Sequence, residues 1–144
     1  MITSILVAVD GSDASQAALR HATEIAKAFS AKLVLINIVD VTKLLAVAGY
    51  ETPYPVDAVE IMRDDAKTIL TEATTTCQNY GVVSREMTSE GDAVDEILNV
   101  AKEEHVDMIA LGTHGRQGIS RLFLGSVAEG VLRRSEVPVL IVRS

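Results

Sequence analysis

Short apolar runs alternate along this chain with longer stretches in which apolar residues recur every three or four positions. The runs predict buried strands, since a strand covered on both faces needs apolar side chains on both. The longer stretches predict helices with one apolar face. In chain order we expect strands at residues 5–9, 33–39, 82–88, 107–111 and 138–142, and helices at residues 13–29, 56–80, 93–104 and 126–134.

The ends of the predicted helices carry recognisable capping residues. Ser12 or Asp13 can cap the first helix through a side-chain oxygen. Gly81 stands where a helix commonly ends in the left-handed conformation. Ser126 and Glu129 have the spacing of a capping box, which predicts a helix beginning at this serine.

This alternation predicts an α/β fold with a mainly parallel sheet, helices on both faces and right-handed crossovers. A length of 144 residues favours one domain over residues 1–144. Residues 40–55, with Gly49, Pro53 and Pro55, read as a long connection with a helical turn at 44–48, and such connections often serve as lids or binding loops. In sheets of this kind, ligands bind beyond the carboxyl ends of the strands, where the strand order reverses.

Composition narrows the classes of partner and compartment. The chain has 13 Lys and Arg against 20 Asp and Glu, for a net charge of −7, so a surface built to bind nucleic acid phosphates is not expected. No run approaches the roughly 20 apolar residues that span a bilayer, so membrane insertion is not expected. With no secretory signal and one cysteine, the sequence predicts a cytoplasmic protein.

A glycine pattern near the C-terminus is the most informative chemical feature. Gly112 and Gly115 are three positions apart, and nine residues later come Gly125 and Ser126. Glycines let backbone N–H groups approach a ligand, and the start of the last helix adds unpaired donors and a positive dipole end. Two such donor sets suit a polyphosphate, with Arg116 and Arg121 in the intervening loop as charged contacts.

Alternative readings of these residues remain open. The glycines can simply shape a turn, Ser126 can simply cap a helix, and His114 can be a solvated loop histidine instead of a phosphate donor. If the glycines do admit phosphate, Gly125→Val should block it while leaving the fold nearly intact. Asp10 is either a turn residue before a helix or a carboxylate acceptor for ligand hydroxyls or a divalent ion.

Other chemistries find little support in the sequence. The chain has no Gly-Lys pair for a Walker motif, and its first turn lacks the three glycines of the dinucleotide fingerprint. Three scattered histidines give no zinc spacing, and no catalytic triad can be assigned, so no catalytic residue is proposed. Cys77 lies in the apolar stripe of the long helix and is expected to pack.

The glycine pattern resembles the ATP-binding signature of the universal stress proteins. The resemblance extends from Ile5–Ser12, through Gly112–Ser126, to Val137–Val142, which is essentially the whole chain. It implies a five-stranded parallel sheet of order 3-2-1-4-5, a nucleotide in the cleft between strands one and four, and a homodimer through the last strand, Val137 to Val142.

The resemblance also assigns roles to individual residues. Phosphates and ribose would meet Gly112, Gly115, Gly125 and Ser126, with His114 and Val127 alongside; Asp10 would lie near the ribose, Ile38 at the adenine and Leu111 beside the base or ribose. It implies a cytoplasmic regulatory or sensing module that binds ATP with Mg²⁺ or Mn²⁺. The alternatives are a slow ATP hydrolase or self-phosphorylating enzyme, and a dimerisation module that binds no nucleotide.

Overall fold

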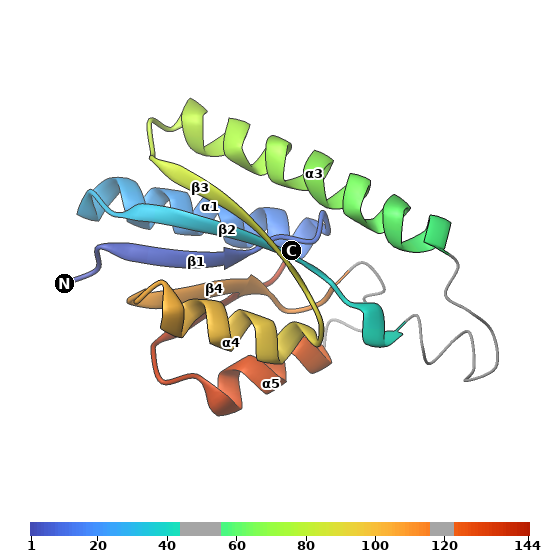
Figure 1. The fold of residues 1–144 in the computed structure, drawn as a ribbon. Helices are drawn as coiled ribbons and strands as arrows, with labels where there is room; N and C mark the ends of the chain where they lie inside the picture. Colours follow the sequence, from blue (N-terminus) through green and yellow to red (C-terminus); the bar gives the residue numbers. More distant parts are fainter. Residues whose placement is uncertain (44–55, 116–122) are drawn as a thin grey trace.

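The computed structural model describes residues 1–43, 56–115 and 123–144. Five parallel strands form one sheet of order β3-β2-β1-β4-β5 (Figure 1). In chain order the elements are β1 (Ser4–Ala8), α1 (Asp13–Phe29), β2 (Lys32–Val39), α3 (Val56–Asn79), β3 (Ser84–Glu90), α4 (Ala93–Glu103), β4 (Met108–Gly112), α5 (Ser126–Arg134) and β5 (Val139–Val142). The predicted fold and strand order are confirmed. The predicted helical turn at 44–48 and the two loop arginines lie outside the described residues.

Two apolar cores cover the two faces of the sheet. Ile5 and Val7 of β1 pack with residues of α1 and α3, whereas Leu6, between them, packs with α4 and α5. Successive strand side chains point to opposite faces, so an uninterrupted apolar strand can supply both cores. Figure 1 shows the same arrangement, with α1 and α3 on one side of the sheet and α4 and α5 on the other.

Strand β3 begins two residues later than the sequence predicts. The N–H of Val82 donates to the carbonyl of Cys77 at 3.0 Å, so it belongs to the end of α3 and not to the sheet. Pairing with β2 starts where the N–H of Leu33 donates to the carbonyl of Val83 at 2.9 Å. Gly81 has φ of 72°, the predicted left-handed conformation that ends α3.

Of the two helix N-caps predicted from side chains, the one on α1 is confirmed and the one on α5 is wrong. Ser12 caps α1, because its side chain accepts a hydrogen bond from the N–H of Ser15 at 3.2 Å. The capping box predicted at Ser126 is wrong: Gly125 is the N-cap of α5, and α5 has no side-chain cap among the described residues. The N–H of Gly125 donates to the carbonyl of Thr113, which holds Gly125 extended and makes Ser126 the first helical residue.

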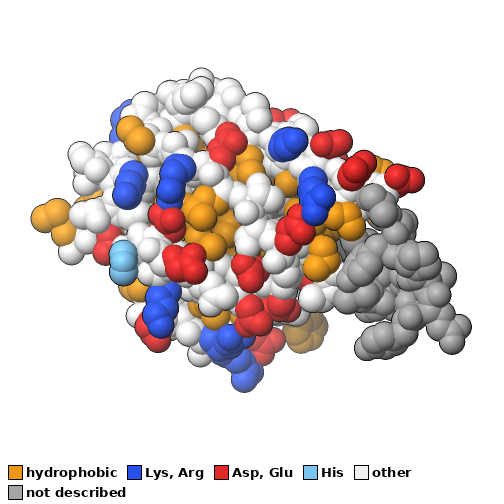
Figure 2. Space-filling model, viewed as in Figure 1, with side chains coloured by type: hydrophobic (Ala, Val, Ile, Leu, Met, Phe, Trp, Pro, Cys, Tyr) orange, Lys and Arg blue, Asp and Glu red, His pale blue; other side chains and the backbone are white. Residues whose placement is uncertain are grey.

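The surface carries charges of both signs. On the face shown in Figure 2, Lys and Arg side chains are interspersed with Asp and Glu. Asp57, Glu60, Asp64 and Asp65 are exposed along α3. Among the helices of the described residues, none is both long and apolar enough to cross a membrane.

Candidate functional site

The strand order reverses between β1 and β4. The chain leaves β1 to form α1 on one face, whereas it leaves β4 to reach α5 on the other. Because the two connections diverge to opposite faces, the carboxyl ends of these two strands are where a ligand can enter (Figure 1). Of the predicted site residues, Gly112 is the last residue of β4, Gly115 lies three residues beyond it, and Asp10 lies two residues beyond the end of β1.

Asp10 is held by the turn that joins β1 to α1. Its N–H donates to the hydroxyl of Ser15 at 3.2 Å, and its Oδ1 accepts from the N–H of Ser12 at 2.8 Å. Gly11 between them has φ of 82°, a conformation that favours glycine. Oδ2 faces Gly115 and lies 3.1 Å from the position that a Cβ would take there. The end of β1 and the turn after β4 are therefore direct neighbours.

Asn37 supports this edge from β2 and was not identified from the sequence. Its side chain is 7% exposed, and its Nδ2 donates to the carbonyl of Val9 at 2.8 Å. The bond fixes the backbone just before Asp10. A lone amide within the apolar run of residues 33–39 was the available signal, since a buried polar side chain needs a partner.

Gly112 has a packing role in the structure. A Cβ at this position would lie 2.6 Å from the backbone carbonyl carbon of Ala14 and 2.8 Å from the nitrogen of Ser15. The first turn of α1 therefore approaches the end of β4 more closely than any side chain allows. Of the two readings open at the sequence level, the structure supports the one in which this glycine shapes the strand end.

Gly125 joins the turn after β4 to α5. Its N–H donates to the carbonyl of Thr113 at 2.7 Å, and a Cβ on Gly125 would come within 2.9 Å of that oxygen. A valine at 125 would displace this carbonyl as well as fill the space beside it. The expectation that Gly125→Val leaves the fold nearly intact is therefore corrected.

The N-terminus of α5 keeps three backbone donors free of helical acceptors. The first intrahelical hydrogen bond runs from the N–H of Glu129 to the carbonyl of Gly125 at 3.0 Å. The N–H groups of Ser126, Val127 and Ala128 consequently have no carbonyl one turn earlier in α5. With no side-chain cap among the described residues and the positive end of the helix dipole here, the position favours an anion.

His114 is tied to both sides of the site. Its carbonyl accepts a hydrogen bond from the hydroxyl of Ser12 at 3.4 Å, and its Nδ1 lies 3.0 Å from Oγ1 of Thr113. Its Nε2 is buried and has no hydrogen-bond partner among the described residues. A solvated loop histidine would not show such a nitrogen. The atom calls for a hydrogen-bond partner, and in the tautomer that carries the proton on Nε2 a phosphate oxygen would supply it.

The predicted apolar contacts share one cluster on the α4 and α5 face. Ile38 at the end of β2 and Val127 in the first turn of α5 are half-buried at its border. Leu111 is 3% exposed, so its side chain belongs to the core. Ile38 and Val127 thus retain surface that can touch an apolar ligand group, whereas the side chain of Leu111 does not.

The described residues form neither a metal-binding cluster nor an exposed thiol. Those residues contain no group of three or more His, Cys, Asp or Glu side chains placed to hold a metal ion. Cys77 is fully buried near Thr23 in the core between α1, α3 and the sheet, and burial raises the pKa of its thiol. The prediction that it packs is confirmed.

These features define a class of protein: a doubly wound parallel α/β protein whose site lies at the switch between β1 and β4. The sequence model of the universal stress protein family matches residues 1–143. This chain belongs to the universal stress protein family. The universal stress protein YxiE of Bacillus subtilis is 36% identical over 149 residues, covering 99% of this chain and all of YxiE.

Solved structures of similar proteins include nucleotide complexes. A universal stress protein in complex with cAMP has a TM-score of 0.74 and 29% identity, covering 98% of this chain and 97% of its own. The universal stress protein of Archaeoglobus fulgidus in complex with dAMP has a TM-score of 0.71 and 26% identity, covering 99% of each chain. Both ligands are adenine nucleotides.

Proposed function

We propose that this protein is a cytoplasmic regulatory module of the stress response that binds ATP between the carboxyl ends of β1 and β4. The observation that carries the proposal is the uncapped N-terminus of α5 beside the buried, unpartnered Nε2 of His114. The helix N-terminus provides N–H donors for an anion, and Nε2 adds a further donor in the tautomer that carries its proton there. The similar proteins that hold cAMP and dAMP support an adenine nucleotide as that anion.

Each part of ATP has a suitable partner in the proposed site. Phosphates would receive N–H groups from Gly115 and the first turn of α5, with Nε2 of His114 as a further donor. Asp10 Oδ2 would accept from ribose hydroxyls, because Oδ1 is already bonded to Ser12. The adenine would lie against the exposed part of Ile38.

A divalent ion would enter this site with the nucleotide. The described residues provide no metal cluster of their own, and Asp10 is the carboxylate at the junction. Mg²⁺ or Mn²⁺ bound to ATP would neutralise phosphate charge. Phosphate oxygens and water would fill the ion's coordination shell while Asp10 holds the ribose.

Replacing Ser126 tests the phosphate site without disturbing the fold. Proline is favoured at the first helical position, and Gly125, with φ of −63° and ψ of 159°, already has the conformation required before a proline. Ser126→Pro thus removes one N–H donor, whereas Ser126→Ala removes only the hydroxyl. We expect Ser126→Pro to bind MgATP about tenfold more weakly than Ser126→Ala in calorimetric titrations.

The possible outcomes separate the site from the function. Equal MgATP affinity in the two variants would contradict the use of the α5 amide. Failure of the unaltered protein to bind MgATP at millimolar concentrations would contradict the proposed function itself. Thermal unfolding of both variants provides the control, since each should melt close to the parent protein.

We also propose a homodimer through β5. This strand lies at an edge of the sheet, and three of its four residues are partly exposed. Pairing with a second copy would satisfy its free backbone groups around a two-fold axis. Light scattering should give twice the monomer mass of 15.4 kDa. Ile141→Pro, which removes an edge donor, should favour the monomer; an unchanged dimer would contradict this interface.

A second candidate function is slow ATP hydrolysis or self-phosphorylation. The unpartnered Nε2 of His114 favours it, because a group that donates to a phosphate can also stabilise charge as the phosphoryl group leaves ADP. A single-turnover assay with radiolabelled ATP and magnesium distinguishes the functions. Release of phosphate or labelling of the protein, lost in His114→Gln, would support the enzyme; intact ATP over hours would support binding alone.

A further inference from the structure

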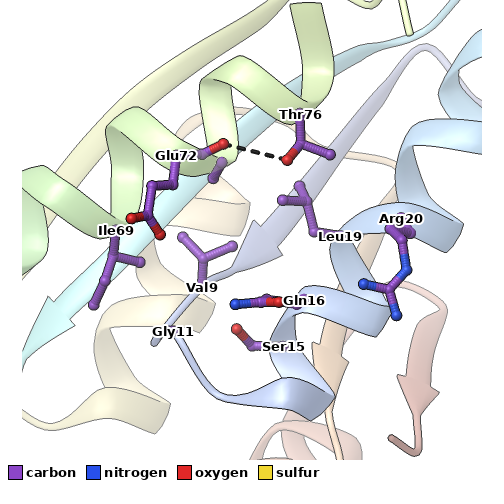
Figure 3. A pocket seen from close by; sticks show the side chains of 10 residues that line it. Val9, Gly11, Ser15, Gln16, Leu19, Arg20, Ile69, Glu72 and Thr76 are labelled. Atoms are coloured by element: carbon purple, nitrogen blue, oxygen red, sulfur yellow. Dashed lines mark hydrogen bonds between the residues drawn. The ribbon is translucent and has the colours of Figure 1, made fainter. Parts of the chain in front are cut away.

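A cavity lies beside the turn that carries Asp10. It has a volume of about 230 Å³ and opens between α1 and α3, on the sheet face away from α4 and α5 (Figure 3). The residues that line it are Val9, Gly11, Ser15, Gln16, Leu19, Arg20, Ile69, Glu72, Ala73 and Thr76. None of these belongs to the predicted nucleotide site.

The base of the cavity is apolar. Val9 at the end of β1, Leu19 of α1 and Ala73 of α3 are each 4% exposed, so their side chains form a fixed surface. Ile69 on α3 is half-buried at the edge. A cavity walled by packed helices and a strand end keeps its shape without a ligand, which lowers the entropic cost of binding.

The rim carries charges of opposite sign. In Figure 3, Glu72 on α3 and Arg20 on α1 lie on opposite sides of the cavity, with Gln16 between them. Both charged side chains are exposed, and neither forms an ion pair with another described residue. Five other pairs are formed within the described chain, so these two charges remain available to a ligand.

Size and charge together restrict the ligand. Drug-sized ligands occupy cavities of roughly 300–1,000 Å³, and this cavity is smaller. An anion alone would meet repulsion from Glu72, and a cation alone would meet repulsion from Arg20. A small zwitterion with an aliphatic part would satisfy both charges and cover the apolar base.

We propose that the cavity between α1 and α3 binds an α-amino acid with an aliphatic side chain. Its carboxylate and ammonium group stand on the same carbon, so the long, exposed side chains of Arg20 and Glu72 would turn toward each other at the rim to meet them. The guanidinium of Arg20 would then bind the carboxylate, and the carboxylate of Glu72 would bind the ammonium group. The aliphatic side chain would cover Val9, Leu19 and Ile69, and the amide of Gln16 would accept or donate a hydrogen bond at the rim. The site does not depend on the proposed nucleotide function.

Methyl NMR of the 144-residue chain tests the proposal with leucine as the probe. We expect leucine to shift the methyl signals of Leu19 and Ile69, which line the cavity, and to leave that of the exposed Leu132 on α5 unchanged. Two analogues each lack one charge: 4-methylpentanoate has no ammonium group, and 3-methylbutylamine has no carboxylate. Each should bind more weakly than leucine by about threefold to fivefold, the scale of an exposed ion pair.

Charge-removing variants assign the two contacts. Arg20→Gln should weaken the binding of leucine by about threefold to fivefold. It should not weaken the binding of 3-methylbutylamine, which has no carboxylate to lose and is repelled by Arg20. Glu72→Gln should weaken the binding of leucine equally and should not weaken that of 4-methylpentanoate, which is repelled by Glu72. Lys27→Gln and Glu103→Gln, which remove exposed charges outside the cavity, serve as matched controls and should bind as the parent does.

Three results would overturn the proposal. If a high concentration of leucine shifts the methyl signals of neither Leu19 nor Ile69, the cavity does not bind amino acids. Equal affinity for leucine and both analogues shows that the rim charges are not used. If Arg20→Gln and Glu72→Gln both bind leucine as tightly as the parent does, leucine binds elsewhere on the protein. All four substitutions are at exposed positions, so thermal unfolding should match the parent and keep the test interpretable.

Discussion

The two ends of the β1–β4 strand pair each hold an aspartate, and the two carboxylates are used differently. At the amino end, Asp107 Oδ2 accepts from the N–H and hydroxyl of Thr3, both at 2.8 Å, and from the N–H of Ser4 at 3.0 Å. At the carboxyl end, Asp10 accepts from one described donor, the N–H of Ser12, while its Oδ2 faces the turn after β4.

The difference distinguishes a structural acid from one that is available to a ligand. The bonds from Thr3 and Ser4 lower the pKa of Asp107, with the backbone N–H of Thr3 the largest cause. Asp10 has similar chemistry, but its neighbours are a buried unpartnered nitrogen on His114 and an uncapped helix. The amino end is closed by its own hydrogen bonds, whereas the carboxyl end retains donors and an acceptor.

The largest effect on stability is expected from placing a side chain at Gly112, where the end of β4 packs closely against the first turn of α1. Gly112→Val places side-chain atoms against the backbone of Ala14 and Ser15, where even a Cβ would lie within 2.8 Å of backbone atoms. We expect a loss of about 3 kcal/mol in the free energy of unfolding, measured with urea. Gly115→Ala is the matched control, because its Cβ would meet only the flexible end of Asp10. Equal losses in both variants would contradict the packing role of Gly112.

A smaller effect, on affinity alone, is expected from Asp10→Asn. The amide keeps an oxygen for the N–H of Ser12 but offers an NH₂ group in place of Oδ2. We expect about tenfold weaker binding of ATP, because an acceptor for ribose hydroxyls is lost. The free energy of unfolding should not change. The variant and the parent should bind 2′,3′-dideoxy-ATP equally; a tenfold difference there as well would contradict a ribose contact.

The smallest effect is expected at the closed end, where it should depend on pH. The pKa of Asp107 in the folded protein lies below that of an unfolded aspartate, because the hydrogen bonds from Thr3 and Ser4 favour the ionised carboxylate. Its stabilising contribution is therefore complete above that unfolded value and is lost as pH falls through the folded value. Urea unfolding should show Asp107→Asn less stable than the parent at neutral pH, with the difference shrinking below about pH 4. Asp64→Asn, at an exposed position on α3, is the control; a pH-independent difference for Asp107→Asn would contradict the mechanism.

The fold could be predicted because its determinants are local. The apolar runs at residues 5–9 and 33–39 and the helical spacing at residues 13–29 lie in continuous stretches of sequence. Their alternation specifies a parallel sheet with helices on both faces. Strand β3 was misplaced by two residues because Val82 looks apolar but bonds to the end of α3.

The candidate site could be predicted only in part, because its contacts join distant positions. The bond from Ser12 to His114 spans 102 residues, and no local pattern marks it. Glycine spacing identified Gly112 and Gly125, but it does not distinguish a ligand contact from close packing against Ala14 or Thr113. The unpartnered Nε2 of His114 also required the structure, since burial of one ring atom is a property of the assembled turn.

The turn from Asp10 to Ser12 lies between the two proposed ligand sites. Gly11 lines the cavity between α1 and α3, and Ser15, which lines it too, receives the N–H of Asp10. A molecule in the cavity that displaces this turn by a fraction of an ångström would change how tightly a nucleotide is held across it. Thermodynamic reciprocity then requires the nucleotide to alter the affinity of the cavity's ligand by the same factor. The occupancy of each site would therefore depend on the cellular concentrations of both ligands.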